Sequence, residues 1–101
     1  MTKEKTLAAY MIFTRESTLD QTALDAYRSA VRATFDGHAH KVLAAYGRQH
    51  VLEGDPAEAT VILEFPSVEV ARAWYDSDAY QAVAQHRLEG SRHRVVLIEG
   101  L

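Results

Sequence analysis

Hydrophobic residues recur along this chain with two different periodicities, and each periodicity predicts a different secondary structure. Apolar residues occupy both sets of alternating positions in Leu7–Thr14, Thr60–Phe65 and Arg92–Glu99, a pattern typical of strands that are covered on both faces. Residues 21–35 instead repeat their apolar positions every three or four residues, which predicts a helix. The apolar face of this helix holds Leu24, Tyr27, Val31 and Phe35.

A strand, an abrupt stop and two helices follow one another in the second half. Pro66 has no backbone N–H to donate, so the strand Thr60–Phe65 is expected to end there. Ser67 can then cap a helix, and Ser77 can cap a second one over residues 79–88. The apolar faces of the two helices hold Val70, Ala71, Trp74 and Tyr75, and then Tyr80, Val83, Ala84 and Arg87.

The middle of the chain has weaker signals. Gly37 is a plausible end for the first helix, and residues 38–46 predict a second strand, although its alanines lower the β-propensity. Residues 49–53 suit a short extension or a hairpin partner, and residues 54–56, which are Gly-Asp-Pro, predict a turn. The resulting order is βαββαβ, the split βαβ arrangement of an α+β ferredoxin-like fold with an antiparallel sheet, in a single domain of residues 1–101.

This element order leaves one face of the sheet without helices, yet the strands are apolar on both faces. The neighbouring pairs Tyr10/Met11, Ile62/Leu63 and Val96/Leu97 show this directly. An antiparallel sheet with one wet face alternates apolar with polar residues instead. Since a large bare apolar face is unusual on a monomer, we expect a second copy to cover it, as a homodimer with a two-fold axis.

Composition excludes several classes of function. The net charge of −3 argues against a nucleic-acid surface, and the absence of cysteine excludes disulfides and thiolate metal sites. The chain has no apolar run near the length of a membrane span, and no phosphate loop or dinucleotide fingerprint. We therefore expect a cytoplasmic protein that works without a cofactor and binds neither membrane nor nucleic acid.

Residues 63–87 carry a family resemblance. Their sequence, LEFPSVEVARAWYDSDAYQAVAQHR, resembles the signature of the domain of unknown function 1330 family, and the resemblance extends more weakly to residues 51–55 and 96–100. Membership of this family implies the dimeric α/β barrel superfamily, and hence the same homodimer. Similar barrels include cofactor-free monooxygenases and lactone isomerases, so the resemblance leaves an enzymatic function open.

Five residues are candidates for ligand binding. Tyr10, His40, Glu64, Trp74 and Arg87 are expected to line a pocket between the sheet and its helices. The ligand would be a small, partly apolar organic acid or phenol, with the forked donors of the guanidinium available to a carboxylate. Which of these residues would be catalytic, if any is, does not follow from the sequence.

Two other interpretations use the same residues differently. In a binding or structural dimer without catalysis, Glu64 and Arg87 would form an ion pair between strand and helix, and Trp74 would belong to the core. In a metal- or haem-associated barrel, His38 and His40 would lie on one face of a strand, with Glu64 as a third ligand.

Overall fold

A computed structural model describes residues 7–101 and contains four strands and four helical segments. In chain order they are β1 (Ala9–Thr18), α1 (Gln21–Val31), the 3₁₀ helix η1 (Arg32–Phe35), β2 (Lys41–Ala45), β3 (Ala59–Phe65), α2 (Val68–Tyr75), α3 (Asp78–Gly90) and β4 (Ser91–Glu99). The strands form one antiparallel sheet in the order β2-β3-β1-β4. The predicted α+β, ferredoxin-like order of elements is therefore confirmed.

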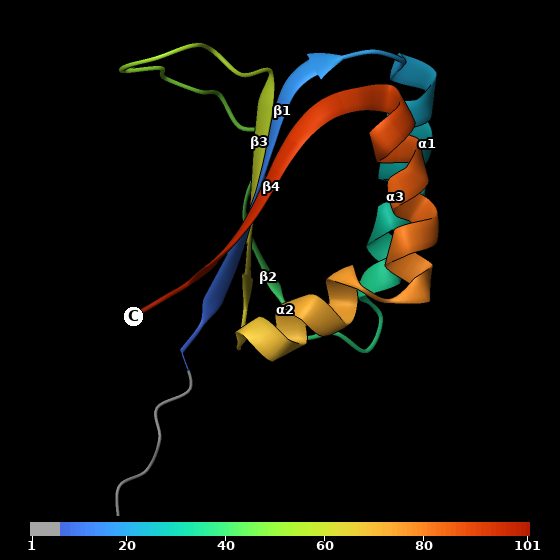
Figure 1. The fold of residues 1–101 in the computed structure, drawn as a ribbon, viewed down its shortest axis with the longest axis vertical. Coiled ribbons are helices and arrows are strands. Elements are labelled where there is room, and N and C mark those ends of the chain that lie inside the picture. The colour runs from blue at the N-terminus through green and yellow to red at the C-terminus, as the bar shows by residue number, and fades with distance from the viewer. Residues whose placement is uncertain (1–6) are drawn as a thin grey trace, which may run out of the picture.

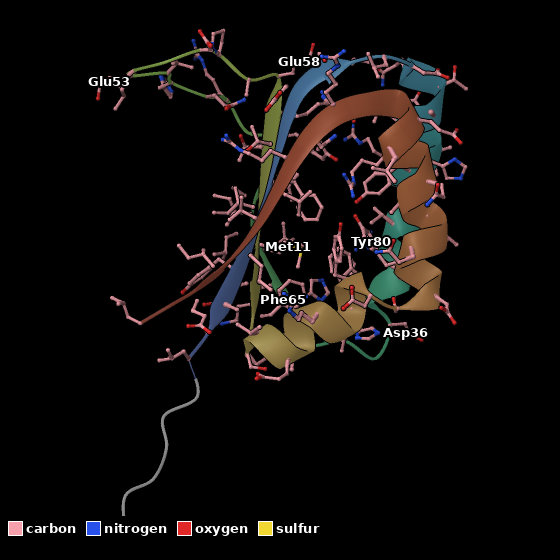
Figure 2. All side chains as sticks on the ribbon, in the orientation of Figure 1. Met11, Asp36, Glu53, Glu58, Phe65 and Tyr80 are labelled. Atoms are coloured by element: carbon pink, nitrogen blue, oxygen red, sulfur yellow. The ribbon has the colours of Figure 1, made fainter. Side chains whose placement is uncertain are left out.

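All the helices lie on one side of the sheet. Figure 1 shows α1 and α3 side by side, at a distance from the curved strands β1 and β4, while α2 lies near the end where β3 finishes. This arrangement divides the sheet into a helix side and an open side. The side chains of Met11, Phe65 and Tyr80 point into the space on the helix side, as Figure 2 shows.

Short polar side chains fix where the helices begin. The carboxylate of Asp20 accepts hydrogen bonds from the backbone N–H groups of Thr22 and Ala23 over 3.0 and 3.3 Å. Ser67 Oγ accepts one from the N–H of Val70 over 3.1 Å, directly after β3 has ended. Satisfied N–H groups in the first turn stabilise a helix by about 1 kcal/mol. Ser77 caps α3 in the same way, through the N–H of Tyr80 over 3.1 Å.

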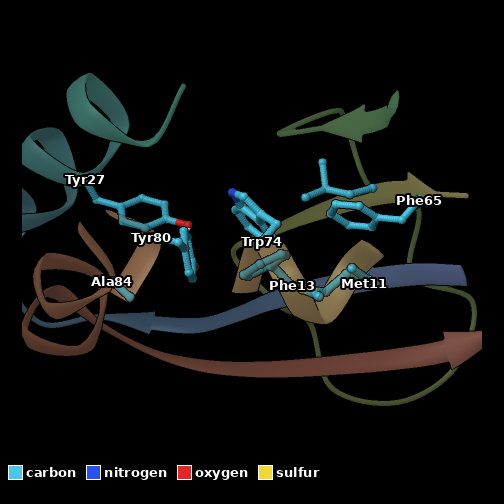
Figure 3. Packing of buried hydrophobic residues seen from close by; sticks show 9 residues of the cluster. Met11, Phe13, Tyr27, Phe65, Trp74, Tyr80 and Ala84 are labelled. Atoms are coloured by element: carbon cyan, nitrogen blue, oxygen red, sulfur yellow. The ribbon is translucent and has the colours of Figure 1, made fainter. Parts of the chain in front are cut away.

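The core lies between the two layers. Buried side chains of the helix side of the sheet meet buried side chains of all three α-helices. They are Met11, Phe13, Leu63 and Phe65 from the strands, and Tyr27, Ala71, Trp74, Tyr80 and Ala84 from the helices. Trp74 lies between Tyr80 and Phe65 at the centre of this cluster (Figure 3).

The second strand is shorter than the sequence predicts. The strand begins at Lys41 and ends at Ala45, so His38 and His40 lie outside it, and the expectation that they share a strand face is wrong. Its pairing with β3 shifts between Val42 and Ala44. Two alanines and a register shift leave few side chains that can pack across to β3, which limits its length.

Residues 46–58 form an extended arm instead of continuing the sheet. The predicted extension or hairpin partner at residues 49–53 carries no strand, and Gly54 turns the arm back with a φ of 90°. Figure 2 places Glu53 at the far end of the arm, on the open side of the sheet. Leu52, 91% exposed, and Val51, 50% exposed, lie on this arm.

Candidate functional site

A cavity of about 170 Å³ lies on the helix side of the sheet. Every strand and the segment from α1 to η1 contribute to its wall, and Trp74 closes it from α2. The residues that line it are Phe13, Tyr27, Val31, Phe35, Val42, Ala45, Tyr46, Ala59, Val61, Leu63, Trp74 and His93. The wall is therefore almost wholly aliphatic or aromatic, with a few polar atoms set into it.

Trp74 is held rigidly in this wall. Its side chain is 0% exposed, and its ring stacks on Phe35 with centroids 4.5 Å apart and planes 8° apart. The indole Nε1 donates a hydrogen bond of 3.0 Å to Thr34 Oγ1. The opposite face of the Phe35 ring stacks on His40 at 4.1 Å. The prediction that Trp74 faces the sheet–helix space agrees with this position.

Two phenols and a guanidinium form a buried chain beside the cavity. The hydroxyl groups of Tyr27 and Tyr80 are 2.9 Å apart, and Arg87 Nε donates to the Tyr80 oxygen over 3.4 Å. Burial raises the pKa values of both tyrosines above the ordinary value, so both remain protonated near neutrality. Arg87 is 4% exposed and its Cζ lies 5.6 Å from the ring centroid of Phe13. Of the three, Tyr27 lines the cavity.

Among the described residues, His93 is the only histidine in the cavity wall. It lies on β4, opposite Arg15 of β1, and its Nδ1 contacts the hydroxyl group of Ser91. Burial, with help from the positive charges of Arg87 and Arg15, lowers the pKa of His93 from 6.5 to about 4. The ring is therefore neutral at neutral pH, and one of its nitrogens is an unprotonated acceptor.

The exposed end of the cavity carries Tyr46. Its backbone has a φ of 59°, in the left-handed region that residues other than glycine seldom adopt. The guanidinium of Arg28, from α1, lies 4.4 Å from the centroid of its ring. This cation–π contact joins α1 to the residue that follows β2, across the mouth of the cavity.

Tyr10 and Glu64 occupy the opposite face of the sheet. The two residues are directly paired between β1 and β3, and the Tyr10 hydroxyl donates to the Glu64 carboxylate over 3.3 Å. Lys41 Nζ lies 4.0 Å from the same carboxylate. Glu64, Lys41 and His40 line a separate depression of about 340 Å³ near the end of β3.

The five predicted residues therefore do not line one pocket. Trp74 and Arg87 lie on the helix side, whereas Tyr10 and Glu64 lie on the open side. The Glu64–Arg87 ion pair of the structural interpretation is wrong for the same reason, since the carboxylate meets Lys41 and the guanidinium meets a phenol. His40 lines the depression that also contains Glu64, and its Nδ1 lies 3.1 Å from the main-chain oxygen of His38.

The histidine pair does not assemble a metal site with the carboxylates. Across residues 7–101, no three His, Asp or Glu side chains lie close enough together to hold a metal ion. His40 stacks on Phe35. Within the same residues no helix combines the length and the hydrophobicity that crossing a membrane requires.

Sequence reasoning missed the polar residues of the cavity wall. His93 belongs to no motif, and Tyr27 was assigned to the apolar face of the first helix. One signal was available for His93. His93 lies two residues before Val95 and four before Leu97, so all three side chains lie on the same face of the last strand. Val95 and Leu97 pack against the core on the helix side, and the alternation therefore places His93 on that side as well.

Comparisons with known proteins agree with the architecture. The family model described as Domain of unknown function (DUF1330) matches residues 8–101. No curated protein sequence matches the chain. A solved structure of a protein of unknown function from Rhodopseudomonas palustris superposes with a TM-score of 0.74 at 19% identity, covering 96% of this chain and 85% of that one.

Two further solved structures share the fold. A dimeric ferredoxin-like protein of unknown function from Thermobifida fusca has a TM-score of 0.63 at 11% identity, covering 94% of this chain and 92% of its own. SnoaB, a cofactor-independent oxygenase from Streptomyces nogalater, has a TM-score of 0.54 at 13% identity, covering 91% and 89%. At such identities the likeness establishes a common fold and nothing about the ligand.

Proposed function

Because this chain belongs to the DUF1330 family, whose description assigns no function, we propose one from the geometry: a homodimer that binds a small single-ring phenol in the cavity between sheet and helices. The observation that carries the proposal is the cavity itself, with aromatic and aliphatic walls and a neutral imidazole among them. Apolar pockets with a few placed polar groups are the usual form of small-molecule sites.

The size of the cavity supports a single ring. Its volume is about 170 Å³. An apolar cavity of about 150 Å³ in another protein is large enough to bind benzene. Trp74 and Phe35 both line the cavity, and because Trp74 and His40 cover the two faces of the Phe35 ring, a bound aromatic ring would meet Phe35 edge-on.

The absence of charge from the described part of the cavity wall favours one of the two ligand classes expected from the sequence, the organic acid and the phenol. No lysine or arginine is found among the described residues that line the cavity. A carboxylate would lose its hydration there without gaining a cationic partner, which is costly. A neutral phenol loses less, because its single O–H group can be satisfied by one acceptor. We therefore favour the phenol, and assign Arg87 the role of supporting Tyr80.

The open side of the sheet supports the homodimer. Ile12 pairs directly with Ile62 on one side and with Val96 on the other, so an apolar row crosses three strands. Polar residues flank this row, among them Thr14 and Glu64. An apolar centre with a polar rim is the usual anatomy of a protein interface. The arm also extends on this side, where its exposed leucine and valine could reach a second copy (Figure 2).

A thermal-shift series tests the ligand. Phenol at ten times its Kd should raise Tm by about 5 °C or more, by mass action on the native state. Val31→Phe, which fills the cavity, should abolish most of this shift, while Leu88→Phe, on the exposed outer side of α3, should retain it. Equal stabilisation by benzoate would favour the organic acid instead, and no shift with either compound would refute the proposed ligand class.

Sedimentation tests the homodimer. At micromolar concentration the protein should sediment at twice the chain mass of 11.3 kDa. Val96→Glu places a charge in the apolar row and should give monomers, whereas Leu88→Glu, at a residue that is also exposed in the single chain but lies on α3, should remain dimeric. A monomeric wild-type protein would overturn the homodimer and leave the cavity proposal to its own test.

A further inference from the structure

Most polar atoms in the cavity wall already have partners. The indole N–H of Trp74 donates to Thr34, and the hydroxyl of Tyr27 shares a hydrogen bond with Tyr80. Tyr46 lies at the exposed mouth. A ligand in the cavity that carries an O–H group must therefore find its acceptor elsewhere, because a buried donor without a partner is unfavourable.

Ser91 fixes which nitrogen of His93 carries the proton. The Ser91 hydroxyl lies 3.0 Å from the main-chain oxygen of Arg87, which can only accept, so the hydroxyl donates to it. The Ser91 oxygen then accepts from His93, and the proton of the neutral ring lies on Nδ1. Nε2 is left with a lone pair and, among residues 7–101, with no hydrogen-bond partner.

The charges around the ring keep this lone pair free. Burial disfavours the charged form of the ring, and the positive charges of Arg87, from α3, and Arg15, paired with His93 from β1, disfavour a third positive charge beside them. The neutral phenols of Tyr27 and Tyr80 add no negative charge on the helix side. Burial, Arg87 and Arg15 lower the pKa of His93 to about 4, so Nε2 is an acceptor throughout the neutral range.

We propose that His93 Nε2 is the specificity-determining acceptor of the cavity, and that it selects rings bearing an O–H group over rings of the same size that lack one. This inference deepens the proposed function and rests on it. Ser91 acts as the positioning residue, because it holds the tautomer and the orientation of the imidazole through Nδ1.

The test compares phenol with anisole, which has the same ring but no donor. We expect the ratio of the anisole Kd to the phenol Kd, measured by calorimetry, to fall about five-fold from wild type to His93→Phe, the factor for one net hydrogen bond. Anisole binding by His93→Phe reports that the variant is folded with its cavity intact. An unchanged ratio would overturn the role of His93.

Imidazole ¹⁵N chemical shifts give a second, independent measurement on the wild-type protein. They should show a proton on Nδ1 and a bare Nε2, whose shift moves when phenol is added and stays constant when anisole is added. Ser91→Ala should allow a mixture of tautomers and weaken the preference for phenol about two-fold. Binding of both compounds with no response at Nε2 would overturn the inference but retain the cavity, whereas binding of neither would overturn the proposed function itself.

Discussion

The Nε atom of Arg87 donates to the hydroxyl oxygen of Tyr80 over 3.4 Å, and both side chains are buried on the helix side of the sheet. Within the described residues this guanidinium lies outside ion-pairing distance of every carboxylate. A buried cation normally needs a partner, and here a phenol oxygen and the face of Phe13 supply it. Tyr80 in turn contacts Tyr27, so one hydroxyl joins α3 to α1, whose Tyr27 lines the cavity.

The two tyrosines should differ in their contribution to stability. Tyr80→Phe removes the partner of both Arg87 and Tyr27, and should lower the free energy of unfolding by about 1–3 kcal/mol. Tyr27→Phe removes a single hydrogen bond and should cost about 0.5–1.5 kcal/mol. Urea denaturation followed by circular dichroism measures both. A larger loss in Tyr27→Phe would contradict the arrangement.

The hydrogen bond between Trp74 and Thr34 should appear as a coupling energy. Thr34→Val leaves the buried indole N–H unpaired and should cost about 1–3 kcal/mol in the wild-type background. In a Trp74→Phe background the same change should cost about 1 kcal/mol less, because the indole donor is gone and only the hydrogen bond from the Thr34 hydroxyl to the main-chain oxygen of Val31 is lost. The two free energies come from a double-mutant cycle in urea. Equal costs in both backgrounds would mean that the bond contributes nothing.

Stability should fall in acid because of His93. Burial, Arg87 and Arg15 lower the pKa of this imidazole from 6.5 to about 4 in the folded state. Between these pH values the unfolded chain binds the proton and the native chain does not, so the free energy of unfolding decreases as pH falls from about 6.5 to about 4. His93→Gln, which does not titrate, should flatten that decrease. Urea denaturation at a series of pH values gives the free energy of unfolding of both proteins. If the two free energies fall in parallel as the pH is lowered, His93 is not the cause of the acid effect.

Substitution by alanine should lower stability at Gly90 and have little effect at Gly47. A Cβ on Gly90 would lie 2.9 Å from Leu24 Cδ2 and 3.0 Å from the main-chain oxygen of Asp20, so Gly90→Ala should cost about 1–3 kcal/mol through overpacking. A Cβ on Gly47 meets nothing within 4 Å, and Gly47→Ala should change stability by less than about 1 kcal/mol. Thermal melts of the two variants give the difference. An unaffected Gly90→Ala protein would mean that α1 and α3 can move apart at this point.

Local chemistry in the sequence was sufficient for most of the element order. Pro66 ends β3 because it lacks a donor, and Ser67 and Ser77 begin α2 and α3 because their hydroxyl groups reach an N–H of the first turn. These contacts span three residues or fewer, so they can be predicted without knowledge of the rest of the chain. The second strand was less predictable, since its length depends on pairing with β3 and on the shift between Val42 and Ala44.

Alternation along each strand is enough to say which strand residues share a face, whereas the packing of the two layers selects which of the two faces the helices cover. Alternation places Glu64 with Ile62 and separates it from Leu63, yet nothing local says where α1 and α3 will pack. The cavity depends on where the helices pack, because this places Tyr10 and Glu64 on the open side and puts His93 and Trp74 in the wall of the same cavity. Side chains separated by many residues meet there through packing of whole layers, and no spacing along the chain encodes such a meeting.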